Sequence, residues 1–418
     1  MNKYKKILIV YAALLIQLEF IGKFLGLPGG IALMYMVLIM ASAYFVQHNS
    51  TYYYALTHGY IKVILLCFAG IFFMGIISLL WSRAPLYGAY KFSMFFFKLL
   101  AMLLVAPIIK EHAKLFLKAF IIISILIIIA FVIKHNNPFQ LALEMGTNNR
   151  FGLDQDTNIE KANPIIIARY FGMVSLVFLF YTFHANRIYL NMLNILFFFI
   201  AVFYLFLTGS KGPVFFLIVP LMIIFILSLR KLNRIIYFLI PLLMITTMLC
   251  LNDTVISFVR DFTESGFFQK RFLDYDYGSA SDRMALYEMA VHGVTEGVPI
   301  LFLLGHGVGD FGFYSFNADY SAYPHNILLE FLYELGLIGF SLLCCIILVM
   351  LKSYWKNRSF MDGYCGIWGI LSVYFLLNSL VTGDMAVNMP TFGFFVLYIV
   401  CSSSRLSQLM PYHMKDQA

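Results

Sequence analysis

The sequence predicts an all-α fold, a bundle of about twelve transmembrane helices with a large hydrophilic loop between the ninth and the tenth. Composition supports this first, because 61% of the 418 residues are hydrophobic and only 12% are charged. A soluble domain carries about 25% charged residues, so most of this chain belongs in an apolar environment. The second observation is a series of apolar runs, each about as long as a membrane is thick.

A helix needs roughly 20 apolar residues to cross the hydrocarbon core of a bilayer. Runs of that kind predict nine helices in residues 1–252, a large outer loop at 253–324, and three more helices with a short tail in 325–418. A further hydrophilic segment, at about 134–163, separates the fifth and sixth helices. The expected helices fall at about 7–25, 29–47, 60–81, 91–109, 115–133, 164–184, 188–207, 212–229, 234–252, 325–351, 365–381 and 388–404.

The basic residues predict the orientation, because Lys and Arg gather on the cytoplasmic side of membrane proteins. With the N-terminus in the cytoplasm, the opposite side keeps few cations in its short connections, chiefly Arg83 and Lys211. Both termini are therefore expected inside, and both long loops outside. The net charge of +8 indicates topology rather than nucleic-acid binding, since no basic stripe is interleaved with aromatic residues. The cations placed inside are Lys110, Lys114, Arg187, Arg230, Lys231, Arg234, Lys352, Lys356, Arg358, Arg405 and Lys415.

Several kinds of site have no support in the sequence. All six cysteines lie in or beside apolar runs, which argues against a disulfide framework. No His/Cys cluster has zinc spacing, and no Walker loop occurs, so neither a metal nor a cofactor is expected. Residues 307–312 fit Gly-x-Gly-x-x-Gly literally, but without a preceding strand they are expected to form a loop.

Two arginines are candidates for binding an anion. Ser and Asp residues before Arg283 are helix-start signals, which place Arg283 in the first turn of a helix in the outer loop. A cation is unfavourable there unless an anion binds beside it; the alternative is a surface Arg paired with Asp282 or Glu288. Arg169 lies about 7–8 Å below the outer end of the sixth helix. A charge inside a span suggests function, although its side chain is long enough to reach the interface.

A third cation occurs at a turn on the outer side. Ser210 and Lys211 lie in a tight turn punctuated by glycine and proline, just before the eighth helix. A cation at a helix start on the outer side is again compatible with an anion site.

The large loop re-enters the membrane at Tyr323-Pro324-His325-Asn326. A neutral imidazole can accept a proton at physiological pH, although a lone His is more often a structural hydrogen-bonding residue. Glu330 and Glu334 share one face of the following helix, where they either orient a network below His325 or pair with cations on other helices. Asp384 is an acid on the outer side with no assigned role.

His325-Asn326, followed after nine residues by Gly336-x-x-Gly339, resembles the signature of the O-antigen ligase and O-antigen polymerase superfamily. These membrane enzymes move a glycan off a polyprenyl pyrophosphate carrier. The likeness covers most of the chain in topology, and its specific motifs lie between residues 208 and 339. It implies an active centre of an intramembrane Arg, an outer-loop Arg and the motif His, here Arg169, Arg283 and His325.

The resemblance also implies a reaction, transfer of a glycan from undecaprenyl pyrophosphate to an acceptor hydroxyl at the outer face of the bacterial inner membrane. The arginines stabilise the leaving group, with help expected from Lys211. Relatives often have Arg at this position; Lys keeps the positive charge but cannot make the bidentate contact. His325 acts as general base and the anomeric centre inverts. Further contacts or support are expected from Ser210, Tyr323, Asn326, Glu330, Glu334 and Asp384.

The identity of the acceptor stays open at the level of sequence. A ligase passes finished polysaccharide to lipid A–core, whereas a polymerase passes a growing O-antigen, capsule or exopolysaccharide chain to the next lipid-linked repeat unit. The close motif match favours the ligase slightly. A polysaccharide transporter or flippase is a third class, but it predicts paired charges near the midplane and two matching halves, which are not visible.

Overall fold

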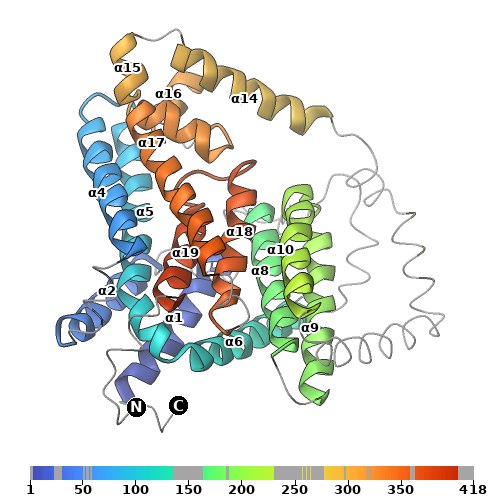
Figure 1. Cartoon of the computed structure of the whole chain (residues 1–418). Coiled ribbons are helices and arrows are strands. Elements are labelled where there is room, and N and C mark those ends of the chain that lie inside the picture. Colours follow the sequence, from blue (N-terminus) through green and yellow to red (C-terminus); the bar gives the residue numbers. More distant parts are fainter. Residues whose placement is uncertain are drawn as a thin grey trace. The chain divides into compact units, whose positions relative to one another are not determined.

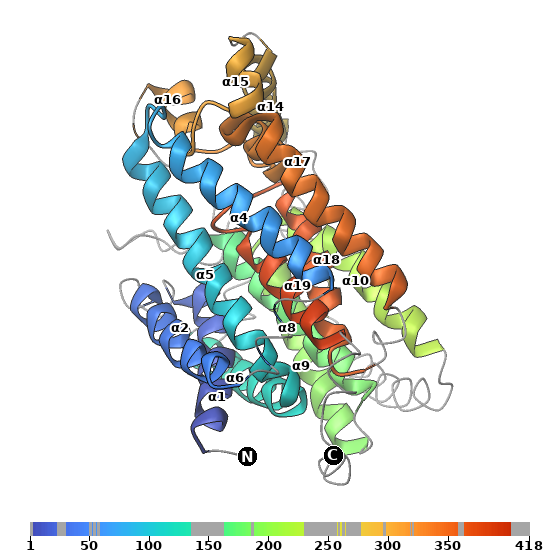
Figure 2. The ribbon, with the colours of Figure 1, turned by 60° about the vertical axis from the view of Figure 1, so that its left-hand side comes forward.

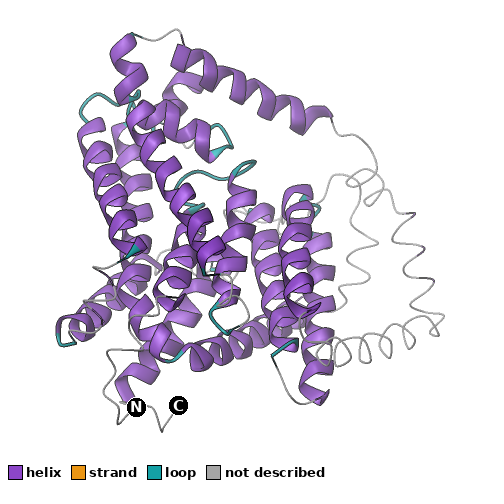
Figure 3. Cartoon of the chain, in the orientation of Figure 1, coloured by secondary structure: helices purple, strands orange, loops and turns teal. Residues whose placement is uncertain are grey.

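The computed structural model describes residues 3–22, 31–49, 52, 56, 59–134, 163–184, 188–229, 257, 260, 264, 277–295, 298–317, 319, 322–357 and 363–402. Within these ranges every regular element is a helix, which agrees with the expected all-α class (Figure 3). Each expected apolar run that falls in the described part coincides with one helix. The run at 234–252 and most of the segment at 134–163 lie outside the described residues.

The helices are labelled in Figure 1. They are α1 (Lys3–Ile21), α2 (Ile31–Gln47), α4 (Tyr60–Ser78), α5 (Pro85–Glu111), α6 (Ala113–Lys134), α8 (Pro164–Thr182), α9 (Ile188–Leu207), α10 (Lys211–Leu229), α14 (Tyr277–Thr295), α15 (Pro299–Leu304), α16 (Asp310–Phe316), α17 (Ile327–Lys356), α18 (Gly366–Ser379) and α19 (Met389–Ser402).

The described helices are those of a multi-pass membrane protein. Seven of them, α4, α5, α6, α8, α9, α10 and α17, are long and apolar enough to cross a membrane, and α2, α18 and α19 are shorter apolar helices. Large apolar side chains such as Leu66 and Phe73 on α4 are 63% and 65% exposed. In water an apolar surface of this kind would favour aggregation, whereas in a membrane the hydrocarbon tails of the lipids cover it without an energetic cost.

The chain divides into two compact units. The first contains residues 1–8, 32–113 and 278–418, and the second contains residues 9–31 and 114–277. In the second unit α8 packs against both α9 and α10. There the buried carboxamide of Gln17 receives hydrogen bonds from the hydroxyls of Ser124 (2.9 Å) and Tyr170 (3.0 Å), which ties α1, α6 and α8 together.

In the first unit α5 packs against α19, α19 against α18, and α4 against α17. The short helices α14, α15 and α16 gather at one end of α4, α5 and α17 (Figures 1 and 2). At the other end the Lys356 ammonium lies over the ring of Tyr60, 5.6 Å from its centre. The expected inner cation Lys356 and the outer-loop helices thus lie at opposite ends of this unit.

Helix α17 is broken at Gly336, whose φ of 65° and ψ of −167° are not helical. The carbonyls of Tyr333 and Glu334, next to the break, accept hydrogen bonds from the N–H groups of His306 and Gly307, both at 2.9 Å. A Cβ atom at Gly336 would lie 2.5 Å from the nitrogen of Gly305. Glycine is therefore required here for its backbone angle and for the close approach of the 305–307 loop.

Candidate active site

His325 stands immediately before α17 in an unusual conformation. Its φ is 56°, a left-handed value that few residues other than glycine adopt. The imidazole is half-buried and meets the ring of Tyr323 edge-on, with 4.6 Å between ring centres. Its Nδ1 is buried and has no hydrogen-bond partner among the described residues. Backbone strain and an unsatisfied polar atom thus coincide at this residue.

The tenth expected helix begins two residues later than the sequence predicts, because Asn326 caps it. The Asn326 side-chain oxygen accepts hydrogen bonds from the backbone N–H groups of Leu328 (2.9 Å) and Leu329 (3.2 Å). A side chain of this kind satisfies donors that the first helical turn leaves unpaired. The His-Asn pair therefore has two structural roles, a cap that starts α17 and an imidazole held beside it.

The charged groups acting on His325 are Arg283 on α14 and Asp384 between α18 and α19. Burial and, next, the Arg283 cation lower the pKa of the imidazole to about 4, while the Asp384 carboxylate partly opposes them. The ring is therefore neutral at physiological pH and can accept a proton. The residue lies outside the helical span of α17, which begins at Ile327.

The structure corrects one expectation about Arg283. Helix α14 begins at Tyr277, so Arg283 lies in its second turn rather than its first. The field of the helix terminus fades within one turn, and the helix-start argument for an anion no longer applies. Among the ion pairs of the described residues none involves Arg283, so the alternative pairing with Glu288 is not formed. The Asp282 side chain lies outside the described part.

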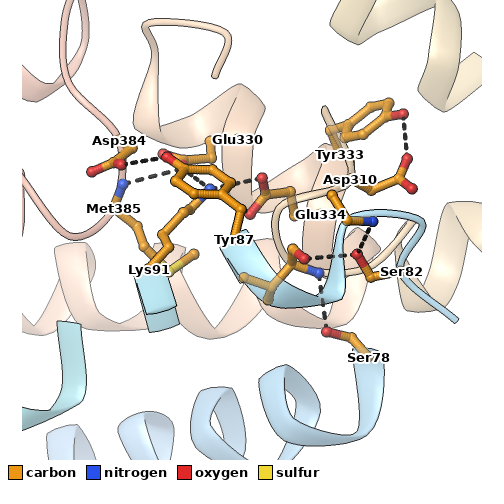
Figure 4. Close-up of polar contacts among 12 residues, drawn as sticks. Ser78, Ser82, Tyr87, Lys91, Asp310, Glu330, Tyr333, Glu334, Asp384 and Met385 are labelled. Atoms are coloured by element: carbon orange, nitrogen blue, oxygen red, sulfur yellow. Dashed lines mark hydrogen bonds and ion pairs between the residues drawn. The ribbon is translucent and has the colours of Figure 1, made fainter. Parts of the chain in front are cut away.

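A buried charge cluster, formed by Lys91, Glu330 and Glu334, lies between α5 and the first segment of α17 (Figure 4). All three side chains are fully buried, and the Lys91 ammonium contacts both carboxylates, with 2.7 Å to Glu334. Glu330 also accepts a hydrogen bond from the N–H of Met385 (3.1 Å). Of the two expectations for these acids, the structure bears out pairing with a cation on another helix, since Lys91 belongs to α5.

Three further residue pairs fix the elements around this cluster. The Tyr87 hydroxyl of α5 donates to the Asp384 carboxylate at 2.9 Å, as Figure 4 shows. At the start of α16, Asp310 accepts two hydrogen bonds from the guanidinium of Arg83, at 2.8 and 2.7 Å. It also accepts one from the Tyr333 hydroxyl at 3.0 Å. Residues 307–309 thus form a loop, as the sequence predicts, whereas residues 310–312 begin helix α16, which the sequence did not predict.

The remaining candidates belong to the second unit. Arg169 on α8 is 1% exposed, so its side chain does not reach back to the surface as the alternative interpretation required. Ser210 is buried in the turn before α10, where Gly209 has a φ of 61°. Lys211 is exposed and is the first residue of α10.

Sequence reasoning missed Lys91, Tyr87 and Asp310 as partners of the groups that hold α5, α16 and the start of α17 together. Lys91 offered a signal, because a lysine in the first part of a long apolar run requires a partner. Asp310 was hidden in the glycine-rich segment 307–312. In the described part of the chain no group of three His, Cys, Asp or Glu side chains is arranged to hold a metal ion.

The model of the O-antigen ligase family matches residues 196–344. This segment begins in α9 and ends in α17, and it includes Lys211, Arg283, His325 and the break at Gly336, whereas Arg169 precedes it. The search of curated proteins gives no match to the chain. The chain therefore carries an O-antigen ligase domain, and the resemblance seen in its His325 motif is confirmed. Domains of this family imply a glycosyltransferase of the ligase or polymerase type that uses lipid-linked glycans.

Proposed function

We propose that the protein transfers a glycan from undecaprenyl pyrophosphate to an acceptor hydroxyl at the outer face of the bacterial inner membrane. The observation that carries this proposal is His325, a neutral imidazole in a strained conformation beside Arg283 within an O-antigen ligase domain. Strain and unsatisfied buried polar atoms each cost about 1–3 kcal/mol and concentrate at functional sites. A merely structural histidine would have relieved both.

His325 is the general base in this reaction. Nδ1 is buried, which leaves Nε2 as the nitrogen that faces a substrate. Nε2 takes the proton of the acceptor hydroxyl while the acceptor oxygen attacks the anomeric carbon. The bond from that carbon to the pyrophosphate oxygen breaks, and its electron pair leaves with the lipid pyrophosphate. Attack opposite the leaving group inverts the anomeric centre, and the base contributes a factor of roughly 10²–10⁴ in rate.

Arg283 stabilises the pyrophosphate as negative charge develops on it, an electrostatic contribution worth several kcal/mol in a water-poor site. We assign the same role to Arg169 and, more weakly, to Lys211 in the second unit. Donor binding also tunes the base. The Arg283 cation is one cause of the low pKa of His325, so an anion bound to Arg283 raises that pKa from about 4 toward its usual 6.5. The imidazole becomes more basic only once the donor is in place.

The acceptor we favour is lipid A–core, which makes the protein an O-antigen ligase without metal or cofactor. The alternative is a polymerase that joins lipid-linked repeat units of O-antigen, capsule or exopolysaccharide. Tyr323, the amide nitrogen of Asn326, and Ser210 are assigned to substrate contacts. Glu330, Glu334 and Asp384 hold the segment that carries His325.

A surface-glycan gel from a deletion strain tests the proposal, with complementation by wild type, His325→Ala or His325→Asn. Asn tolerates the left-handed backbone but cannot act as a base, so it separates conformation from chemistry. Bare lipid A–core with accumulated lipid-linked polymer in both variants supports the ligase. Core capped by a single repeat unit assigns the polymerase instead. A normal ladder from His325→Asn, at wild-type protein level, would refute the role of general base.

A further inference from the structure

A cavity of about 500 Å³ opens beside α14, outside the surroundings of His325. Pockets of roughly 300–1,000 Å³ are the usual size of small-molecule sites. The lining residues come from α14, α15, α16, the α4–α5 connection and the α15–α16 connection, all in the first unit. They include Trp81, Arg83, His292, His306, Asp310 and Tyr314.

The charges in this cavity are already balanced. The Arg83 guanidinium donates twice to Asp310, at 2.8 and 2.7 Å, and the same carboxylate accepts the Tyr333 hydroxyl at 3.0 Å. Arg83 also lies over the ring of Phe313, with 5.1 Å to its centre. A phosphate entering here would compete with Asp310 for its cation. The cavity therefore favours a neutral polar ligand over an anion.

The other polar groups are held in place for such a ligand. His306 stacks on Tyr333 with 4.5 Å between ring centres and 10° between planes. Its Nε2 lies 3.0 Å from the carbonyl of Gly293 and must donate to it, which leaves Nδ1 as an acceptor in the neutral ring. The Trp81 indole N–H donates to the Gly305 carbonyl at 3.0 Å, which fixes the indole ring at the cavity wall.

We propose that this cavity binds a sugar residue of the glycan, a proposal that rests on the proposed function. A pyranose ring has apolar C–H faces that pack against aromatic rings, and hydroxyls that pair with imidazole, phenol and guanidinium groups. His292 follows Arg283 by nine residues on α14, or about 14 Å along the helix axis at 1.5 Å per residue. The bound sugar is therefore not the residue that reacts but one farther along the glycan, and the cavity is a subsite that holds the chain during transfer.

The test measures binding to the full chain in lipid nanodiscs by saturation-transfer NMR. The probe is the delipidated repeat-unit oligosaccharide released from the surface glycan of the producing cell. His292→Ala and Tyr314→Phe are expected to weaken the dissociation constant by roughly 3- to 10-fold each, the usual value of one lost hydrogen bond. Glu288→Gln is the matched control, because Glu288 is exposed on the same helix and does not line the cavity.

The outcomes separate this proposal from the proposed function. Equal affinity in wild type, His292→Ala and Tyr314→Phe would overturn the subsite, as would displacement of the oligosaccharide by inorganic pyrophosphate, which would mark an anion site. His325→Asn should bind the oligosaccharide like wild type. If His325→Asn also makes normal surface glycan while the cavity variants lose binding, the general base is wrong and the sugar site stands.

Discussion

The first segment of α17, residues 327–335, and His325 just before it differ in how their polar groups are partnered. Within the segment, Glu330 in the first turn and Glu334 beside the break are fully buried and share the ammonium of Lys91. Just before the segment begins, His325 is half-buried, strained, and has a buried Nδ1 with no partner among the described residues. The buried charge cluster therefore organises the scaffold, whereas the imidazole of His325, which no scaffold group in the described part of the chain holds by its Nδ1, is the side chain proposed to meet the acceptor hydroxyl through Nε2.

The largest loss of stability is expected on replacing Lys91, the cation of the buried charge cluster. Lys91→Met leaves two buried carboxylates without a cation and should destabilise the protein by about 3–5 kcal/mol. Thermal unfolding of the detergent-solubilised protein measures it. Lys98→Met is the control, since Lys98 is a second buried lysine of α5 and its ammonium donates to a backbone carbonyl, that of Ala386, at 3.3 Å.

A charge-free version of the cluster separates the loss of charge pairing from the loss of packing. Adding Glu330→Gln and Glu334→Gln to Lys91→Met removes the uncompensated charge and should restore most of the lost stability. If the triple variant is no more stable than Lys91→Met, packing rather than charge pairing explains the loss.

The break in α17 gives the next largest effect. Gly336→Ala forces a Cβ against the backbone of Leu303 and Gly305 at a φ of 65°, and should cost more than about 2 kcal/mol. Gly59→Ala is the matched control, because Gly59 has a φ of 71° but no atom within 4 Å of a built Cβ. That variant should lose less stability, because it bears only the cost of a backbone conformation that residues with a Cβ rarely adopt and no clash. Equal losses, measured by the same thermal unfolding, would mean that the loop crossing the break yields easily.

Apolar run lengths were enough to predict the long apolar helices of the described part, because each span must satisfy its backbone within itself. The His325 motif identified one of the two non-glycine residues that have a positive φ there. Lys91 could not be placed, since its partner Glu334 is 243 residues away and only the packing of α4, α5 and α17 brings them together. Arg283 was placed in the wrong helical turn, because helix-start signals at Ser and Asp residues do not exclude an earlier start at Tyr277.

A smaller effect is expected where the scaffold meets the loop that carries Asp384. Tyr87→Phe removes the hydroxyl that donates to the Asp384 carboxylate at 2.9 Å, and should cost about 1–3 kcal/mol by leaving a buried acceptor unpaired. Tyr90→Phe is the matched control on the same helix, because Tyr90 is 64% exposed. Thermal unfolding of both variants checks this, and equal stabilities would show that Asp384 finds another donor.

The smallest expected effect is a change in the pKa of His325 when Arg283 is replaced. A neighbouring cation disfavours the protonated imidazole, so Arg283→Gln should raise the pKa of His325 above its value of about 4. Burial is the larger cause and persists in the variant, which keeps the new pKa below the usual 6.5. NMR of histidine-labelled protein measures it, with the His325→Asn spectrum identifying the signal.

The pH dependence of the reaction should show the same effect of Arg283 on the pKa of His325. The acid limb of kcat/KM reports the free enzyme and should fall near pH 4, whereas the acid limb of kcat reports the donor complex and should lie at higher pH. The reason is that the bound pyrophosphate neutralises Arg283. In Arg283→Gln the acid limbs of kcat and kcat/KM should lie at nearly the same pH, because no cation remains for the donor to neutralise. Limbs that coincide in wild type would contradict the proposed contact between the donor pyrophosphate and Arg283.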